Sequence, residues 1–268
     1  MSNTIAVYSL WRDSEPHIDR TLKQFEDLES LDYEFEYYFY ENDSEDNTAS
    51  ILIDWTSSRE GNLLTERINT KKFGRTTDME RMKTMCDLRN RCRNLVLGSQ
   101  SKYTVLIDSD IIFNKENLLK HIETIESLDD AAMVTPNIRQ NIPDFVYGLT
   151  EDSYYDVYPL FDRFGSQGLY WTDCPLQNGI DRMNWSLGKP IKCNSAFGGF
   201  SLIKTDILKK VKWSTDGACD HVNFCKEVNE FGSIYIDPLN KVFANIDLSK
   251  YNLKDFEHRA KMQLNGQV

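Results

Sequence analysis

Hydrophobic positions along the first half of the chain alternate between two spacings. Short continuous apolar runs, typical of buried strands, cover residues 4–10, 34–40, 103–107 and 131–135. Apolar residues at three-to-four spacing, which predict helices, cover residues 15–28, 48–55, 78–97 and 115–128. The alternation predicts an α/β fold with a mostly parallel central sheet flanked by helices. Right-handed crossovers then bring the carboxyl ends of the strands to one edge, where open α/β sheets bind ligands.

The pattern changes after residue 136. Residues 137–190 show weaker periodicity, and ten aromatic residues fall between positions 145 and 185. A long irregular segment inside a domain is usually functional, so these rings either present flat faces to a ligand or pack beneath the loop. Further strands are predicted at 200–203 and 233–236, and further helices from 205, over 220–231 and over 250–264. No linker divides the chain, so a single domain is expected.

Composition narrows the class of protein. The 268 residues include 31 Lys and Arg against 42 Asp and Glu, a formal net charge of −11. Such an acidic chain lacks the positive face of a nucleic-acid binder, which excludes that class. The hydrophobic fraction of 40% is ample for a core and excludes disorder as the main state. Neither a long apolar run nor a basic leader is visible, which predicts a cytoplasmic protein without a membrane span or secretory signal.

The six cysteines form no C-x-x-C pair, and the chain has four histidines. This pattern argues against a zinc site and for reduced thiols. Cys86, Cys92 and Cys225 fall on apolar helix faces, so we expect them to pack in the core.

Two carboxylates follow the predicted strand at 103–107. Asp108 and Asp110 are spaced i, i+2 at the strand end, where the pleat breaks and both can turn toward the ligand edge. Their hard oxygen donors suit Mg²⁺ or Mn²⁺ far better than zinc. The pair therefore indicates a divalent cation site, the alternative being an acidic turn that caps the following helix.

A second acidic turn follows the predicted strand at 34–40. Residues 41–47 read Glu-Asn-Asp-Ser-Glu-Asp-Asn, a composition that favours a tight turn and a helix N-cap. On the ligand edge, Glu41 and Asp43 are also placed to accept hydrogen bonds from a base N–H or a ribose hydroxyl, as acidic residues do at dinucleotide sites.

Basic residues are concentrated between positions 71 and 93, which hold eight Lys and Arg and three Asp and Glu. Arginine forks suit phosphate oxygens, so Arg81 and Arg89 are candidates to bind a diphosphate. The alternative is a solvated helix face with salt bridges to nearby acids.

Two further motifs precede predicted elements. Gly198 and Gly199 stand directly before the strand at 200–203, where adjacent glycines permit either a bulge or a close approach of the backbone to a ligand. Asp220 and His221 open the helix over 220–231. Asp220 is either an N-cap or, if it faces the Asp108 edge, a general base. His221 is either a buried side chain or a base or metal ligand.

These motifs in this order resemble nucleotide-sugar-dependent glycosyltransferases of the GT-A fold. The matching stretches, within about residues 4–240, are YENDSEDNT at 40–48, LRNR at 88–91, LIDSD at 106–110, SAFGGFSLIKTDIL at 195–208 and CDHVNF at 219–224. The nearest types are fungal capsule-associated mannosyltransferases and related glycosyltransferases of large viruses. The resemblance implies one domain with a nucleotide-binding half at about 1–136, an acceptor and catalytic half at about 137–248 and a C-terminal helix at about 249–268.

The resemblance also implies roles for individual residues. The metal ligands would be Asp108, Asp110 and His221, the last in place of the late histidine of many GT-A enzymes. Asp220 would be the general base of an inverting enzyme, or would bind the donor sugar in a retaining one. The implied donor-binding residues are Ser9, Trp11, Arg12, Glu41, Asp43, Arg81, Arg89, Asp108, Gly198 and Gly199.

The implied activity is that of a hexosyltransferase, which moves a sugar from a UDP- or GDP-linked donor to a glycan or glycoprotein acceptor. Bound Mn²⁺ or Mg²⁺ would stabilise the charge that develops on the diphosphate leaving group. Two other functions stay open. One is a nucleotidyltransferase that makes nucleotide sugars, although residues 9–14 lack the glycine that class carries after its first strand. The other is a non-catalytic carbohydrate-binding protein on the same fold.

Overall fold

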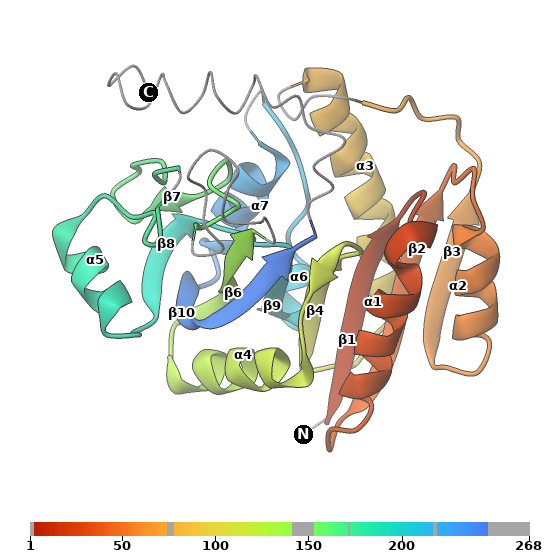
Figure 1. Cartoon of the computed structure of the whole chain (residues 1–268), viewed down its shortest axis with the longest axis horizontal. Helices are drawn as coiled ribbons and strands as arrows, with labels where there is room; N and C mark the ends of the chain where they lie inside the picture. The colour runs from red at the N-terminus through yellow and green to blue at the C-terminus, as the bar shows by residue number, and fades with distance from the viewer. Residues whose placement is uncertain (1–2, 74–77, 141–152, 171, 217–218, 246–268) are drawn as a thin grey trace.

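A computed structural model describes residues 3–73, 78–140, 153–170, 172–216 and 219–245 of the chain. The C-terminal helix predicted at about 249–268 lies outside the described residues, as do Phe145, Tyr147 and Trp171 of the aromatic segment. A ten-stranded sheet runs through the described residues, with helices packed against it (Figure 1).

Most strands of this sheet run in one direction. The strands are β1 (Thr4–Trp11), β2 (Glu34–Asn42), β3 (Gly61–Glu66), β4 (Tyr103–Asp108), β5 (Ile111–Ile112), β6 (Ala131–Gln140), β7 (Phe161–Asp162), β8 (Ile191–Ser195), β9 (Phe200–Lys204) and β10 (Ser233–Ala244). Their order is β3-β2-β1-β4-β9-β6-β10-β8-β7, with β5 paired to β10. The four longest ladders are parallel, whereas β9 runs against β4 and β6 and β8 runs against β10. The predicted α/β fold with a mostly parallel sheet is confirmed.

Helices cover both faces of the sheet. They are α1 (Glu15–Leu28), α2 (Thr48–Thr56), α3 (Met79–Val96), α4 (Lys115–Ser127), α5 (Gly179–Ser186), α6 (Thr205–Leu208) and α7 (Asp220–Val228). Figure 1 shows α1, α2 and α4 on one face, and α3, α6 and α7 on the other. In the described residues no helix is both long and apolar enough to cross a membrane.

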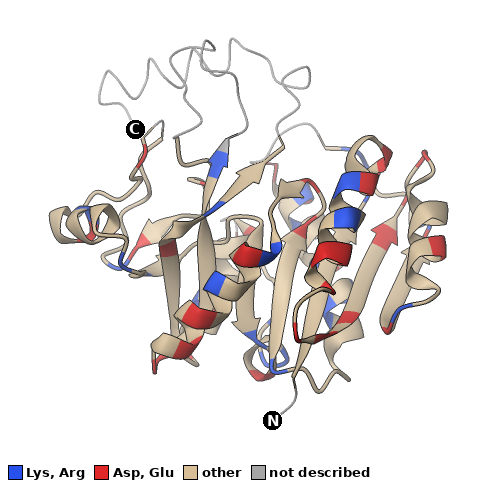
Figure 2. Ribbon diagram, turned by 60° about the horizontal axis from the view of Figure 1, so that its bottom comes forward, with Lys and Arg blue, Asp and Glu red and all other residues tan. Residues whose placement is uncertain are grey.

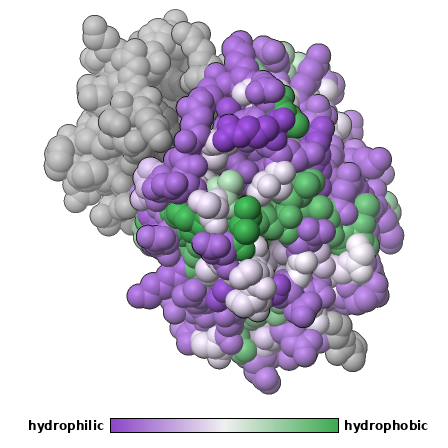
Figure 3. All heavy atoms as spheres, turned by 90° about the vertical axis from the view of Figure 1, so that its right-hand side faces the viewer, coloured by the Kyte–Doolittle hydropathy of each residue, from purple (hydrophilic) through white to green (hydrophobic). Residues whose placement is uncertain are grey.

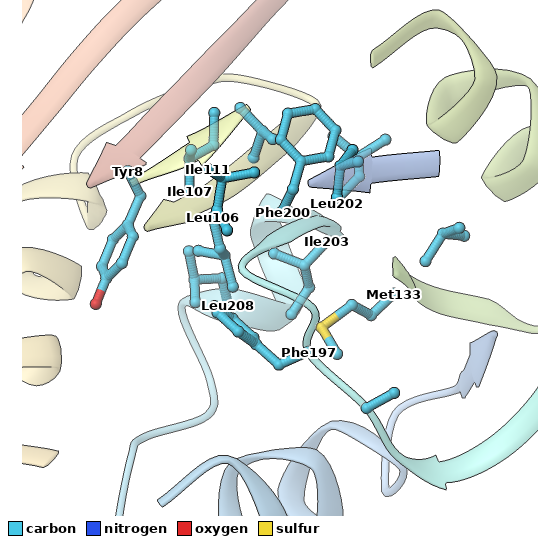
Figure 4. Close-up of a cluster of buried hydrophobic side chains, with 14 of the residues drawn as sticks. Tyr8, Leu106, Ile107, Ile111, Met133, Phe197, Phe200, Leu202, Ile203 and Leu208 are labelled. Atoms are coloured by element: carbon cyan, nitrogen blue, oxygen red, sulfur yellow. The ribbon is translucent and has the colours of Figure 1, made fainter. Parts of the chain in front are cut away.

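The centre of the sheet is the most deeply buried part of the chain. Leu106 of β4 and Phe200 and Leu202 of β9 have no measurable exposure, and Figure 4 shows them packed among side chains from neighbouring elements. Full burial of a side chain of this size stabilises the fold by about 1.5–3 kcal/mol. Because β4 is held between β1 and β9, the position of Asp108 at its carboxyl end is fixed by the core.

The sheet extends beyond the predicted strands at several places. Strands β3 and β8 and helix α5 were not predicted, and the expected boundary near residue 136 falls inside β6. Proline at 136 is tolerated there because β10 bulges between Asp237 and Lys241, directly opposite. At the far end, β3 is the edge strand of the described sheet, and hydrophobic side chains gather over the α2 and β3 side (Figure 3).

Candidate active site

A buried arginine joins three of the residues singled out by sequence. Arg89 lies on α3, Asp108 ends β4, and Asp220 and His221 form the start of α7. Arg89 Nε donates to Asp220 Oδ2 at 3.0 Å, Nη1 donates to Asp108 Oδ1 at 3.4 Å, and Nη2 lies 3.1 Å from His221 Nε2. We call these four residues the Arg89 cluster. Asp220 therefore faces the same edge as Asp108.

The Arg89 cluster controls the protonation of its own members. Burial raises the pKa of Asp220, but the charges of His221 and Arg89 outweigh it and hold that pKa at about 2. Burial lowers the pKa of His221 to about 4, against the raising effect of Asp220. The imidazole is therefore neutral at pH 7, and Arg89 is the cation that faces both carboxylates.

The ring of Phe197 packs against the Arg89 cluster. It stacks on His221 with the centroids 3.9 Å apart and the planes 17° from parallel, and Arg89 Cζ lies 5.3 Å from its centroid. On the other side, the Tyr8 hydroxyl donates to the carbonyl oxygen of Arg89 at 3.0 Å. Arg89 is only 6% exposed and is the internal counter-ion of Asp108 and Asp220, and the diphosphate contact expected from its sequence stays a prediction.

At Gly198 and Gly199 the backbone packs closely against the Arg89 cluster. Gly198 and Gly199 have φ of +66° and +62°, a left-handed conformation that favours glycine. The Asp108 N–H donates to the Gly199 carbonyl at 2.9 Å. A Cβ on Gly199 would lie 2.6 Å from Ile111 Cδ1 and 3.4 Å from Asp108 Oδ2, so glycine is required for this close approach. The glycines let the backbone approach Ile111 and Asp108 closely, and the approach to a ligand expected from the sequence stays a prediction.

Asp156 belongs to the same site although the sequence did not single it out. The Gly198 N–H donates to Asp156 Oδ2 at 2.8 Å. Burial raises the pKa of Asp156 to about 7, and the charges of Asp108 and Asp220 add to the rise against the Gly198 N–H and Arg89. The residue lies in the aromatic segment, between β6 and β7, where no periodicity marks it. The only signal in the sequence was the functional character expected of that segment as a whole.

The predicted metal ligands are only partly gathered. Asp110 is exposed in the turn after β4, and its carbonyl oxygen accepts from Arg20 Nη2 at 3.4 Å. His221 directs Nε2 at Arg89, and the described residues contain no group of three His, Cys, Asp or Glu that could hold a metal. Asp108 and Asp110 nevertheless fit Mg²⁺ or Mn²⁺, because proteins often hold such ions through one or two carboxylates with substrate phosphates as further ligands.

The acidic turn after β2 holds a loop in place. Asp43, at φ +56°, accepts hydrogen bonds from the N–H groups of Ile68, Asn69 and Thr70, each at 2.8 Å. Arg12 donates to Thr70 Oγ1 and Thr70 O at 2.9 and 3.0 Å. The hydrogen bonds that Asp43 accepts outweigh the cost of burying its carboxylate and lower the pKa of Asp43. Asp43 therefore fixes the loop at 68–70, and the ribose or base contact expected of it stays a prediction.

The remaining predicted donor contacts from this end of the sheet are buried. Trp11 is 1% exposed and packs against Phe25 and Phe39 with ring centroids 6.3 and 5.5 Å away. Trp11 is thus part of the core, and Ser9 is fully buried beside it on β1. The donor contacts expected of these two residues stay predictions. Glu41 Oε1 accepts from the Ser44 N–H at 3.0 Å and so shapes the turn from within.

Four of the seven described basic residues between 71 and 93, Arg89 among them, are paired with acids. Lys71 pairs with Glu80, Lys72 with Asp13 and Glu45, and Arg91 with Glu66. Acidic and basic residues are likewise interspersed along the helices in Figure 2. The salt-bridged helix face, the alternative interpretation of this stretch, therefore describes these residues well.

Arg81 is different from the other basic residues of α3. It is half-buried, makes no ion pair with the part of the chain that the structure describes, and lowers the pKa values of His221 and Tyr158, whose main determinant is burial. Arg81 is thus a cation beside the Arg89 cluster that is available to an anion.

Comparison with known proteins supports the fold. No family model and no curated protein sequence matches the chain. Among solved structures, S. aureus TarS 1-349 in complex with UDP-GlcNAc has a TM-score of 0.53 and 15% identity, over 91% of this chain and 58% of that one. The mannosyltransferase PcManGT from Pyrobaculum calidifontis, in complex with GDP-Man and Mn²⁺, has a TM-score of 0.52 and 14% identity, over 91% of this chain and 57% of that one.

These similarities concern the fold. The chain spans about 60% of the length of TarS 1-349, and a mycobacterial protein matches with a TM-score of 0.51 at 14% identity, over 92% of this chain and 69% of that one. The GT-A-like glycosyltransferase fold expected from the motifs is therefore confirmed, whereas the fungal capsule-associated type stays a prediction.

Proposed function

We propose that this chain is a metal-dependent glycosyltransferase that moves a hexose from a UDP- or GDP-linked donor to a glycan hydroxyl. The observation that carries the proposal is the convergence of Asp108, Asp220, Arg89 and the Gly198–Gly199 turn at the carboxyl edge of the sheet. Two proteins with this fold are known in complex with UDP-GlcNAc and with GDP-Man and Mn²⁺.

The proposed cation site consists of Asp108 and Asp110. A divalent cation bound there supplies positive charge to the diphosphate as the bond to the sugar breaks. Arg89 keeps the Asp108 side chain oriented through its contact at 3.4 Å. Because Arg89 is shared with Asp220, it also restrains the side chain at the start of α7.

The remaining contacts with the donor are proposed from where the residues lie in the structure. Arg81 is the proposed partner of the diphosphate, because its charge is available beside the cluster. The loop at 68–70, fixed by Arg12 and Asp43, is the proposed wall of the nucleoside site at the ends of β1, β2 and β3. Asp220, ion-paired to Arg89, is better suited to bind a donor-sugar hydroxyl than to accept a proton, which is the second of the roles expected from sequence.

Calorimetric titration of UDP and GDP, with and without Mn²⁺, tests this proposal. Mn²⁺ should tighten the binding of one nucleotide by about tenfold or more, because a cation held by Asp108 and Asp110 would add positive charge beside the phosphates. Asp110→Ala should abolish the effect of Mn²⁺. Asp129→Ala is the matched control, because Asp129 is exposed in the loop between α4 and β6, at the opposite edge of the sheet, and should bind nucleotide as the unmodified chain does.

The two alternatives give different results. A non-catalytic carbohydrate-binding protein would bind neither nucleotide in a Mn²⁺-dependent way, and that outcome would remove the proposed function. A nucleotidyltransferase would release nucleoside triphosphate from a nucleotide sugar and pyrophosphate, whereas the proposed enzyme releases UDP or GDP from UDP-GlcNAc or GDP-mannose.

A further inference from the structure

Resting on the proposed function, the geometry points to Asp156 as the carboxylate that takes the proton from the attacking acceptor hydroxyl. Nothing in the sequence motifs assigns a role to this residue. It lies in the segment between β6 and β7 and reaches the Gly198–Gly199 turn through the hydrogen bond from the Gly198 N–H, 2.8 Å long.

The two carboxylates of the Arg89 cluster are already ion-paired. Asp220 Oδ2 accepts from Arg89 Nε at 3.0 Å, and its Oδ1 lies 3.5 Å from Cys219 Sγ. Asp108 Oδ1 is 3.4 Å from Arg89 Nη1. A carboxylate that is ion-paired to a buried guanidinium is a poor proton acceptor, because protonation would break the ion pair and leave the cation unpaired.

Asp156, in contrast, is not ion-paired within the described residues. The Gly198 N–H fixes one carboxylate oxygen, while the other makes no hydrogen bond within the described part of the chain. One oxygen is thereby oriented by backbone, and the second is left to a ligand. A positioned carboxylate of this kind is what general base catalysis requires.

The surroundings of Asp156 favour proton uptake near neutral pH. The charged groups that act on it are Asp108 on β4, Asp220 on α7 and Arg89 on α3. Burial is the largest effect, and together with the two carboxylates it brings the pKa to about 7 despite the Gly198 N–H and Arg89. A base whose pKa lies near the working pH is partly deprotonated and still strong enough to take a proton.

The proposed step is a direct displacement at the anomeric carbon of the donor sugar. The acceptor hydroxyl gives its proton to the free oxygen of Asp156 while its lone pair forms the bond to the anomeric carbon. The bond from the anomeric carbon to the diphosphate oxygen breaks, and its electron pair leaves with the nucleoside diphosphate. Asp156 then passes the proton to solvent, which restores the carboxylate.

Release of UDP from UDP-GlcNAc and of GDP from GDP-mannose, with Mn²⁺ present and water as the acceptor, measures this step. Asp156→Asn should lower kcat by about 10²–10⁴-fold, the usual contribution of a general base. Binding of UDP or GDP should change little, because the proposed nucleotide contacts are Arg81 and the loop at 68–70 rather than Asp156. Asp156→Glu should recover part of the rate, and the fall of kcat/KM toward acid pH that the unmodified chain shows should be absent from Asp156→Asn.

Asp129→Asn is the matched control. Asp129 is exposed in the loop between α4 and β6, at the opposite edge of the sheet from Asp156. This variant should keep both the rate and the pH profile. Carbon-13 spectra of the ligand-free protein give a second measurement, in which one carboxyl group should titrate near pH 7 and should be missing from Asp156→Asn.

Two results would overturn the inference. One is an Asp156→Asn variant that retains the rate and the pH profile of the unmodified chain. The other is a ligand-free protein in which no carboxyl group titrates near neutral pH. Neither touches the proposed function, which fails instead if Mn²⁺ has no effect on the binding of either nucleotide.

Discussion

Gly199 shows how a single residue links the core to the candidate site. It combines a φ of +62° with an ideal Cβ position 2.6 Å from Ile111 Cδ1 and 2.8 Å from Ile111 Cγ1. Gly199→Ala should therefore destabilise the fold by about 2–5 kcal/mol, since backbone strain of about 1–2 kcal/mol adds to overpacking of about 1–3 kcal/mol. Urea unfolding monitored by circular dichroism measures the change.

Gly165→Ala separates the two costs. Gly165 has a φ of +84°, but nothing lies within 4 Å of its ideal Cβ position. The alanine at 165 should cost about 1–2 kcal/mol from backbone strain alone. Equal losses at 165 and 199 would contradict the view that contact with Ile111 and Asp108 demands glycine at 199.

At the scale of elements, helix α3 carries Arg89 and has an N-terminus that is capped by a side chain. Asp78 caps it by accepting from the Glu80 N–H at 2.9 Å and the Arg81 N–H at 3.5 Å. Asp78→Ala should cost about 1 kcal/mol of unfolding free energy. Lys83 lies on the same helix, is exposed and makes no ion pair with the described residues, so Lys83→Ala should cost clearly less in the same urea experiment. A larger loss at Lys83 would contradict this account.

Elements with a strong hydrophobic period could be predicted from the sequence. Elements that depend on pairing with distant strands could not. Helices α1 to α4 agree with their predicted bounds to within one residue at each end. Strand β3 was missed because an edge strand half in contact with solvent has a weak apolar pattern, and the reversed direction of β9 leaves no trace in periodicity. Arg89 and Asp220 were each found, but their ion pair spans 131 positions and no local pattern reveals it. Asp156 was missed for the same reason.

At the scale of the whole molecule, His121 ties three elements together behind the site. It projects from α4, is fully buried, and places Nε2 3.1 Å from the Phe200 carbonyl of β9 and Nδ1 3.0 Å from Asn240 Nδ2 of β10. The geometry fits a neutral imidazole that donates from Nε2 and accepts at Nδ1. A second proton would turn Nδ1 into a donor facing the donor of Asn240, so protonation of His121 opposes the native packing.

The stability of the chain should therefore carry a pH dependence that belongs to His121. Burial lowers its pKa to about 3, against the raising effect of the Phe200 carbonyl. Below about pH 6.5 the unfolded chain binds a proton that the native imidazole does not, so acid favours unfolding. His121→Gln removes this group, and between about pH 6 and 4.5 the unmodified chain should lose stability relative to the variant by about 1.4 kcal/mol per pH unit. Other titrating groups cancel in that difference. Urea unfolding of both proteins across this range measures it, and a difference that stays constant with pH would show that protonation of His121 is not coupled to folding.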